Sequence, residues 1–350
     1  MLATEPSAVA DTNPVSPPAE PHLAWKHIIS PVEPFLAAVA DRLKEQINAF
    51  ERDIAVYAEY ALTNQGKQLR PALVALSGGA TGKINDSHVM VAVIIEMVHL
   101  ATLVHDDVMD EARIRRGRPT LAANWGSEIS VLLGDCLFAH ALKLAASFPT
   151  TEICREVASA TNTVCSGEIL QTQRRRNFEL SRAEYFQVLQ MKTGELFALS
   201  CDLGAYLSGA GAVQRSALRQ YGMAVGTAYQ VYDDCLDLFG SEAVVGKSLG
   251  TDLAKGKLTL PLLLALEDAT PSVRSNIESM VRDWSPDRFG ALLKILRDHR
   301  TLERSQAEVH QHLQLARENL EVLPRTESRT GLAGLTEYLE AQTTSLGTAL

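Results

Sequence analysis

The chain has 350 residues, of which 46% are apolar and 21% are charged, and its formal net charge is −9. With a mean hydropathy close to zero, these values fit a soluble globular protein. The acidic excess argues against a general nucleic-acid binder, and an anionic substrate would need basic residues or metal ions gathered at its own site.

The N-terminal segment is rich in proline: the first 34 residues hold seven of the chain's fourteen prolines, and no Lys or Arg precedes Lys26. This composition predicts a flexible tail over residues 1–34. It is typical neither of a transit peptide, which would be rich in Arg, nor of a signal peptide. The longest apolar stretch, residues 89–104, is interrupted by Glu96 and His99. That stretch is short for a membrane span, so no transmembrane segment is expected.

From residue 35 onward the pattern is helical, because apolar residues recur at three- and four-residue steps and alternating strand patterns are nearly absent. No change of composition marks a second domain, so residues 35–350 are predicted to form one all-α domain. Two segments, 89–104 and 129–145, are apolar on nearly all faces, which predicts that they lie in the middle of a bundle. The expected helices cover residues 35–62, 68–80, 86–111, 119–146, 151–174, 181–208, 211–240, 259–268, 271–283, 286–298, 302–321 and 330–346.

The five cysteines are scattered, odd in number and without a CxxC pair. This pattern favours reduced thiols in a cytoplasm over a disulfide framework. A packed, inert thiol is the simplest interpretation of each of them. We therefore expect a cytoplasmic protein.

Two aspartate clusters, HDDVMD and YDDCLD, are the candidate catalytic motifs. Positions i and i+4 lie on one face of a helix, so each cluster brings carboxylates of like charge close together. The clusters follow apolar runs that should be buried, and burying unpaired carboxylates is costly. Oxygen ligands favour Mg²⁺, which usually bridges one or two carboxylates to a substrate phosphate. One cluster alone could be a solvated charged face, but two of them predict a diphosphate held by several ions. The carboxylates are those of Asp106, Asp107, Asp110, Asp233, Asp234 and Asp237.

Basic residues flank both clusters, where a diphosphate would need them. Arg binds phosphate through paired hydrogen bonds and Lys as a point charge. Each could singly be an ordinary surface charge, but as a set in an acidic protein they predict an anion site. The motifs GKQLRP, IRRGRP, MKTGEL and GKSLGTDLAKGK supply Lys67, Arg70, Arg115, Arg116, Lys192, Lys247 and Lys257.

With these motifs in place, the sequence resembles the trans-isoprenyl diphosphate synthases, and most of all their long-chain, octaprenyl- or solanesyl-type members. The likeness runs from about Gly66 to Pro261. It implies a single-domain helical bundle of the isoprenoid synthase type with a deep central apolar cavity, normally a homodimer. The motifs that carry it are GKQLRP, EMVHLATLVHDDVMDEARIRRGRPT, GD at 134–135, GEILQ at 167–171, KT at 192–193, YQVYDDCLD and GKLTLP.

The resemblance also implies a reaction, the Mg²⁺-dependent, sequential condensation of isopentenyl diphosphate with an allylic diphosphate. Farnesyl or geranylgeranyl diphosphate is the expected starter, and pyrophosphate is released. Metal ions and basic residues would stabilise the departing pyrophosphate, and the apolar cavity would protect the carbocation from water.

Site roles follow from the same resemblance. The six aspartates would hold Mg²⁺, three ions with substrate bound, and Lys192 would act with them in catalysis. His99 could instead be a satisfied core histidine, and His105 is expected to be structural. The allylic diphosphate would contact Arg115, Lys192, Gln230, Lys247 and Lys257, isopentenyl diphosphate would contact Lys67, Arg70, His99 and Arg116, and Thr193 would line the site.

Product length in this family depends on the residues four and five positions before the first aspartate, where a bulky aromatic blocks elongation. Here these are Thr102 and Ala101, both small, which predicts a long product that could pass to a membrane. Two alternatives stay open. Ala101 could merely allow close helix packing, or a bulky residue of the 129–145 segment could block the tunnel.

Two rival functions are weighed against the synthase. A class I terpene cyclase also ionises a diphosphate, but its second metal motif is of mixed Asn/Ser/Glu type and it needs no second diphosphate site. A regulatory subunit tends to lose one aspartate cluster, whereas this chain keeps both. The chain ends in EYLEAQTTSLGTAL where many relatives carry basic residues, so C-terminal closure over isopentenyl diphosphate is not inferred.

Overall fold

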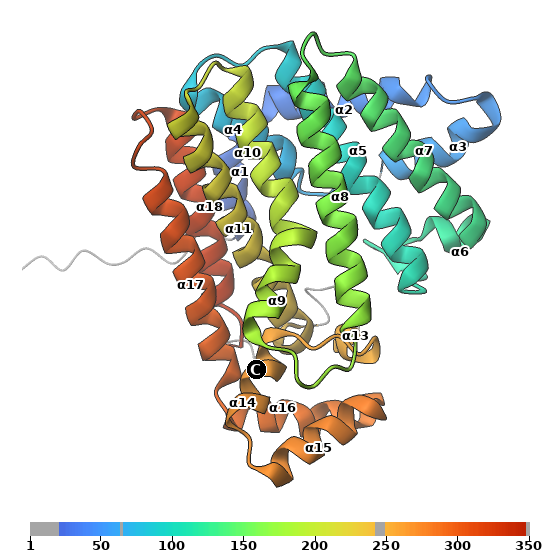
Figure 1. Cartoon of the computed structure of the whole chain (residues 1–350), viewed down its shortest axis with the longest axis vertical. Coiled ribbons are helices and arrows are strands. Elements are labelled where there is room, and N and C mark those ends of the chain that lie inside the picture. The colour runs from blue at the N-terminus through green and yellow to red at the C-terminus, as the bar shows by residue number, and fades with distance from the viewer. Residues whose placement is uncertain (1–20, 64–65, 242–248, 348–350) are drawn as a thin grey trace, which may run out of the picture.

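The computed structural model describes residues 21–63, 66–241 and 249–347, and these residues are almost entirely helical (Figure 1). The predicted all-α fold is confirmed. Within the described residues, the strands β1 (Ile114–Arg115) and β2 (Arg118–Pro119) form a two-stranded antiparallel hairpin. The helices are α1 (Pro21–Ile29), η1 (Ser30–Val32), α2 (Glu33–Ile47), α3 (Arg52–Leu62), α4 (Leu69–Thr81), α5 (Asp86–Met109), α6 (Leu121–Trp125), α7 (Ser127–Ala146), α8 (Thr151–Gln173), α9 (Arg182–Leu189), η2 (Gln190–Gly194), α10 (Glu195–Leu207), α11 (Ala212–Phe239), α13 (Thr251–Ala254), α14 (Leu260–Asp268), α15 (Pro271–Arg282), η3 (Pro286–Arg288), α16 (Phe289–Asp298), α17 (Thr301–Asn319) and α18 (Glu327–Thr344).

The helices α5 and α10 form the centre of the bundle. α5 packs against α4, α7 and α10, and α10 packs against α4 and α11. All residues of α5 from 91 to 98 and all residues of α10 from 195 to 205 are buried. The expectation that segment 89–104 lies inside the bundle is therefore confirmed, and its apolar composition follows from burial on every side.

The same expectation is wrong for segment 129–145, which forms most of α7. One face of α7 is buried through Leu133, Leu137 and Ala141, while Leu132 on the opposite side is 60% exposed. α5 and α7 are both long and apolar enough to cross a membrane by length and composition alone. In their most apolar windows, 72% of α5 but only 39% of α7 is buried. Burial in the core thus explains the composition of α5 and not that of α7.

The predicted flexible tail is also wrong in part, because residues 21–34 form α1, η1 and the start of α2. Proline suits the first turn of a helix, where its missing N–H has no partner to lose, and Pro31 and Pro34 occupy such positions. Trp25 of α1 packs against Tyr338 of α18, with ring centroids 5.8 Å apart. Residues 1–20 lie outside the described part of the chain.

The other helices follow the predicted segments closely, with three interruptions. The segment 35–62 divides at residues 48–51, 119–146 divides at Gly126, and 181–208 contains the π-helical turn η2. Gly126 adopts φ +88°, a conformation that favours glycine and ends α6. Apolar periodicity cannot show such breaks, since the residues on either side keep the same spacing.

Candidate active site

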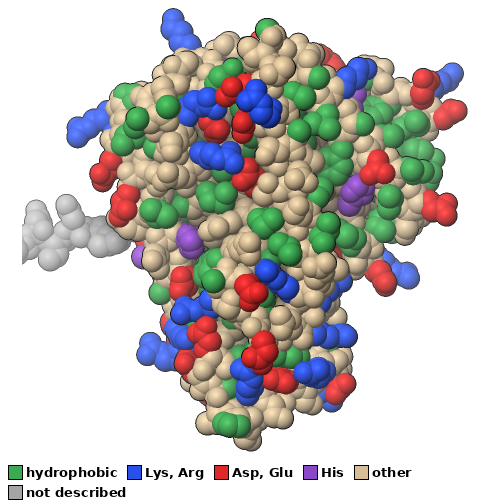
Figure 2. Space-filling view, viewed as in Figure 1, with side chains coloured by type: hydrophobic (Ala, Val, Ile, Leu, Met, Phe, Trp, Pro, Cys, Tyr) green, Lys and Arg blue, Asp and Glu red, His purple; other side chains and the backbone are tan. Residues whose placement is uncertain are grey.

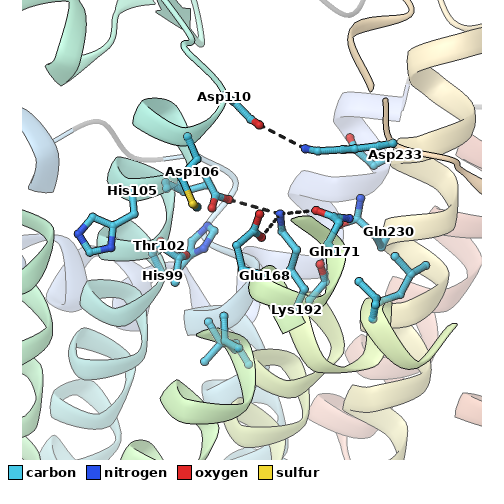
Figure 3. Close-up of a pocket in the computed structure, with 18 of the residues that line it drawn as sticks. His99, Thr102, His105, Asp106, Asp110, Glu168, Gln171, Lys192, Gln230 and Asp233 are labelled. Carbon is cyan, nitrogen blue, oxygen red and sulfur yellow. Dashed lines mark hydrogen bonds and ion pairs between the residues drawn. The ribbon is translucent and has the colours of Figure 1, made fainter. Parts of the chain in front are cut away.

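A cavity of about 1030 Å³ opens between α4, α5, α7, α8, η2 and α11 (Figure 3). The two aspartate clusters, far apart in the sequence, reach it from opposite sides at the C-terminal ends of α5 and α11. Apolar side chains such as Leu103, Val164 and Leu196 form part of its wall. The predicted site residues that line it are Lys67, Arg70, His99, Thr102, Asp106, Asp110, Arg115, Arg116, Lys192, Thr193, Gln230, Asp233, Asp234 and Lys257.

Two of the six predicted metal ligands do not line this cavity. The Asp107 carboxylate accepts a hydrogen bond from Nε of Arg115 at 2.7 Å. Asp237 accepts bonds from the backbone N–H and the hydroxyl of Thr251 at 3.2 and 2.6 Å, and from the N–H of Asp252 at 3.0 Å. These two carboxylates therefore hold neighbouring parts of the site in place. The predicted ligand Lys247 lies outside the described residues.

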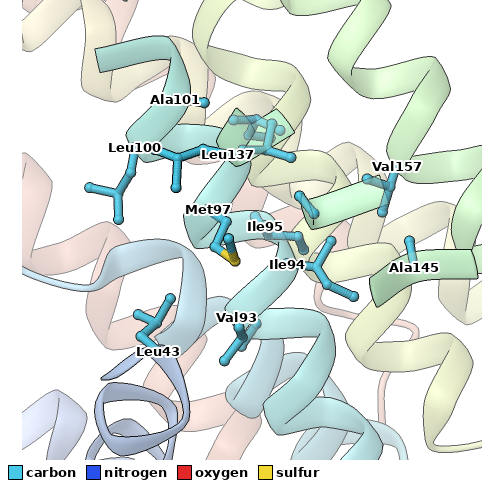
Figure 4. Close-up of a cluster of buried hydrophobic side chains, with 14 of the residues drawn as sticks. Leu43, Val93, Ile94, Ile95, Met97, Leu100, Ala101, Leu137, Ala145 and Val157 are labelled. Atoms are coloured by element: carbon cyan, nitrogen blue, oxygen red, sulfur yellow. The ribbon is translucent and has the colours of Figure 1, made fainter. Parts of the chain in front are cut away.

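The predicted chain-length residues occupy different environments. Thr102 lines the cavity, whereas Ala101 is fully buried in the core (Figure 4). The deeper residue Met97 is packed in the same core, so the cavity does not follow this face of α5. Phe138 of α7 lines the cavity instead. Ala101 therefore serves helix packing, which is one of the alternatives left open by the sequence, and Phe138 is a bulky α7 side chain on the cavity wall.

Lys192 connects the first aspartate cluster with α8. Its Nζ contacts the Glu168 carboxylate, lies 2.9 Å from Oε1 of Gln171 and lies 3.7 Å from the Asp106 carboxylate (Figure 3). Burial alone would lower the pKa of Lys192, but Asp106 and Glu168 outweigh it and raise that pKa. Burial raises the pKa of Asp106, against the opposing charge of Lys192. Lys192 is accordingly a charged ammonium group held at the centre of the site.

The π-helical turn η2 sets the direction of Lys192 and Thr193. π-turns insert an extra residue into a helix and occur often at functional sites. The close approach of α8 requires a glycine, because a Cβ on Gly167 would lie 2.9 Å from the backbone nitrogen of Lys192. The Thr193 hydroxyl donates to Oε1 of Gln230 at 2.8 Å. Both side chains are thereby fixed at the wall of the cavity.

Asp234 of the second cluster is a buried carboxyl group with two side-chain donors. The Tyr185 hydroxyl donates to it at 2.6 Å and Nε2 of Gln230 donates at 2.9 Å. Burial, followed by the neighbouring Asp252 carboxylate, raises the pKa of Asp234 to about 8. A cation approaching such a group favours its charged form.

The basic end of the cavity is formed by the GKQLRP and IRRGRP segments, which pack against each other. Gly66 lies against the Arg116 guanidinium, since a Cβ on this glycine would meet it at 2.5 Å. Arg70 lies over the ring of Phe197 at 4.9 Å. Burial, together with Arg70 and Arg116, lowers the pKa of His99 well below its ordinary value, so this histidine is neutral at pH 7. The structure thus brings together the residues predicted to hold a second diphosphate.

The donors in the cavity fit a hard divalent cation. Asp106, Asp110 and Asp233 present carboxylate oxygens, the ligands that Mg²⁺ prefers. Among the described residues, no three His, Cys, Asp or Glu side chains converge into a ready-made metal cage. Mg²⁺ typically takes one or two protein carboxylates and completes its shell with phosphate and water. The arrangement therefore suits metal that enters with a diphosphate.

The model of the polyprenyl synthetase family matches residues 51–296 of the chain. The chain belongs to the polyprenyl synthetase family. A similar curated protein is heptaprenyl diphosphate synthase component 2 of Bacillus subtilis strain 168, 33% identical over 308 residues that cover 85% of this chain and 88% of that one.

Solved structures agree with this membership. A decaprenyl diphosphate synthase from Rhodobacter capsulatus has a TM-score of 0.86 at 30% identity, covering 91% of this chain and 99% of that one. A polyprenyl synthase from Caulobacter crescentus CB15, complexed with calcium and isoprenyl diphosphate, has a TM-score of 0.86 at 31% identity, covering 91% of this chain and 97% of that one. The predicted family, its all-α fold and the assignment as a prenyltransferase are confirmed.

Several residues of this polyprenyl synthetase site were missed in the sequence. Glu168 and Gln171 belong to the GEILQ segment, a motif of the resemblance that does not by itself assign them a contact. His105, expected to be structural, lines the cavity with Nε2 3.0 Å from the Val131 carbonyl. Arg175 and Lys255 contact Asp110, at 3.3 and 2.8 Å. The only sequence signal for these two was their positive charge close to recognised motifs.

Proposed function

We propose that this polyprenyl synthetase family member is an all-trans polyprenyl diphosphate synthase. It condenses isopentenyl diphosphate repeatedly with an allylic diphosphate, farnesyl or geranylgeranyl diphosphate as starter, and releases pyrophosphate. The supporting observation is one cavity that combines facing carboxylates, two groups of basic side chains and an apolar wall. The carboxylates and nearby basic side chains suit the allylic diphosphate with its cations, and the second basic group suits the diphosphate of isopentenyl diphosphate. The apolar wall suits the carbon chain that remains after ionisation.

We infer that Mg²⁺ is the cofactor, with three ions present when substrate is bound. Acidic and basic side chains line the cavity in nearly equal numbers, so two diphosphates would leave a large negative charge without added cations. The calcium bound by the Caulobacter protein supports a divalent cation. When bound, the metal draws charge from the leaving diphosphate. Lys192, Lys257 and Arg115 would add hydrogen bonds to the same oxygens.

The second substrate would occupy the basic end. There Lys67, Arg70 and Arg116 would hold the diphosphate of isopentenyl diphosphate, with the neutral His99 as a hydrogen-bonding neighbour. The apolar wall would keep water from the allylic cation. The growing tail would pass Thr102 toward α7 and α8, where the cavity-lining residues Val131 and Ile169 are 41% and 59% exposed. These apolar cavity-lining residues support a long-chain product, which would then pass to a membrane.

We also propose that the protein is a cytoplasmic homodimer. Figure 2 shows apolar side chains gathered over α7 and α8, and Leu132 of α7 is among the most exposed. Apolar surfaces of this kind mark interaction sites, and a second copy would cover this one by a two-fold pairing. All five cysteines are free, which supports a reducing compartment. The Bacillus relative is named as a component, so a different partner chain is the competing arrangement.

Labelled isopentenyl diphosphate tests the function. With farnesyl diphosphate and Mg²⁺, the purified chain alone should consume it and yield long dephosphorylated products on reversed-phase chromatography, and a chelator should stop the reaction. Asp106→Ala and Asp233→Ala should each cut turnover by about a hundredfold or more, since each removes charge stabilisation from the leaving group. Glu128→Ala, on the exposed first turn of α7, is the matched control.

Two results would contradict the proposal. A folded wild-type chain that leaves isopentenyl diphosphate unused, with or without a cyclic product from the allylic substrate, would point to a cyclase or a regulatory subunit. Normal turnover in either Asp→Ala variant, with its fold confirmed by circular dichroism, would remove the carboxylates from the mechanism.

A further inference from the structure

Asp110, which caps the C-terminal end of α5, is surrounded by three cationic side chains. Nζ of Lys255 lies 2.8 Å from its carboxylate, and Nη2 of Arg175 and Nζ of Lys257 each lie 3.3 Å away. Lys257 also lies 3.7 Å from the carboxylate of Asp252. Three cationic side chains thus share two carboxylates through direct contacts. Donors of this kind also form strong hydrogen bonds with phosphate oxygens.

Two loops that are distant in sequence bring Arg175 and Lys255 together. The N–H of Arg176, in the loop after α8, donates to the carbonyl of Gly256, in the loop after α13, at 2.8 Å. Gly256 has φ +71°, and a Cβ there would lie 2.7 Å from Cγ of Arg176. Glycine is therefore required for the contact. The residues next to this contact, Arg175 and Lys255, are consequently held on the same carboxylate.

Asp110 does not use all the hydrogen-bond donors of Arg175 and Lys255. Lys255 lines the cavity and keeps 27% of its side chain exposed. Arg175 does not itself line the cavity, but 27% of its side chain is exposed, and its Nε is buried without a hydrogen-bond partner. An ammonium group has three donors and a guanidinium group has five, so each has further donors to offer to a ligand beside Asp110.

We propose that Arg175 and Lys255 are diphosphate-binding residues of the prenyl-transfer site. This inference rests on the proposed function and adds two cations that the family resemblance does not assign. In the ligand-free chain they neutralise Asp110. When a diphosphate enters, the donors that Asp110 does not use bind its oxygens.

Inorganic pyrophosphate in metal-free buffer is the probe, because it isolates these side chains from the metal. Calorimetric titration of the full chain in EDTA should detect binding. Arg175→Gln and Lys255→Gln should each weaken it by about tenfold, the value of one charged hydrogen bond. Arg113→Gln removes the same charge from an exposed arginine outside the cavity and should leave the binding unchanged. Arg175→Lys and Lys255→Arg keep the charge and should retain binding.

The alternative is that the two cations only neutralise Asp110. In that case the Gln variants would melt at lower temperature and bind pyrophosphate as the wild type does, which would overturn the proposal. Absence of metal-free binding by the wild type would overturn it too. If a Gln variant does not fold, the charge-conserving variant decides, and a loss of its binding counts against direct contact. Prenyl transfer by the wild type is measured separately, so either failure leaves the proposed function standing.

Discussion

Thr102 and Ala101 are neighbours on α5, yet only Thr102 faces the cavity, while Ala101 packs in the core. Thr102→Phe should therefore shorten the dominant product without abolishing condensation, because the ring would fill the space that the growing tail enters. Chromatography of the dephosphorylated products measures this. Ala101→Phe should instead lower the free energy of unfolding by about 1–3 kcal/mol through overpacking, as measured by urea unfolding. A shorter product from Ala101→Phe but not from Thr102→Phe would contradict the cavity assignment.

Residues within one motif also differ in their surroundings. On α5, Asp106 and Asp110 are four residues apart and share the face that lines the cavity, while Asp107 points to Arg115. This follows from helix geometry. On α11, Asp233 and Asp234 line the cavity, but Asp237 is drawn to the backbone at the start of α13. The sequence pattern does not predict the short helix α13 that binds the Asp237 carboxylate. The separate role of Asp237 therefore could not be predicted from the sequence.

At the scale of elements, the N-terminus of α5 is joined to α10 through His88. Nδ1 of His88 lies 3.1 Å from the backbone nitrogen and 3.0 Å from Oδ1 of Asn85, and Nε2 lies 3.1 Å from the Gly204 carbonyl oxygen. His88 is fully buried, and this burial lowers its pKa below the ordinary value. The neutral imidazole is therefore the form that the fold requires.

This requirement predicts a pH dependence of stability. Above the unfolded-state pKa of about 6.5, both states are neutral at His88 and its contribution to stability is complete. As the pH falls below that value, the unfolded chain takes up the proton first, so the free energy of unfolding decreases. Urea unfolding from pH 7.5 to 5.5 should show this decrease, and His88→Asn should show a shallower one. An equal slope in both proteins would mean that His88 is not the responsible group.

At the scale of the whole molecule, α7 is apolar but lies at the side of the bundle. If a second copy covers it, Leu132→Asp should convert the dimer to monomers, because burying each leucine contributes about 1.5–3 kcal/mol and a two-fold interface loses two of them. Light scattering after size exclusion measures the mass. Val213→Asp, at an exposed apolar position on α11 (72% exposed), is the control and should stay dimeric. A monomeric wild type, or a dimer that survives Leu132→Asp, would contradict this assembly.

The sequence by itself determined the all-α class, the family, the central position of α5 and the meeting of the two aspartate clusters. The class and the central position of α5 follow from helical periodicity, whereas the family and the pairing of the two clusters follow from short motifs that resemble those of known synthases. Only the tertiary structure decided which α7 side chains line the cavity, which apolar helix stays partly exposed, and which basic side chains surround Asp110. Phe138 lines the cavity because α7 packs beside α5, and Arg175 reaches Asp110 across 65 residues. Apolar periodicity predicts that a helix face is buried but not which element packs against it. The sequence likewise shows that a residue is charged but not which residue it contacts.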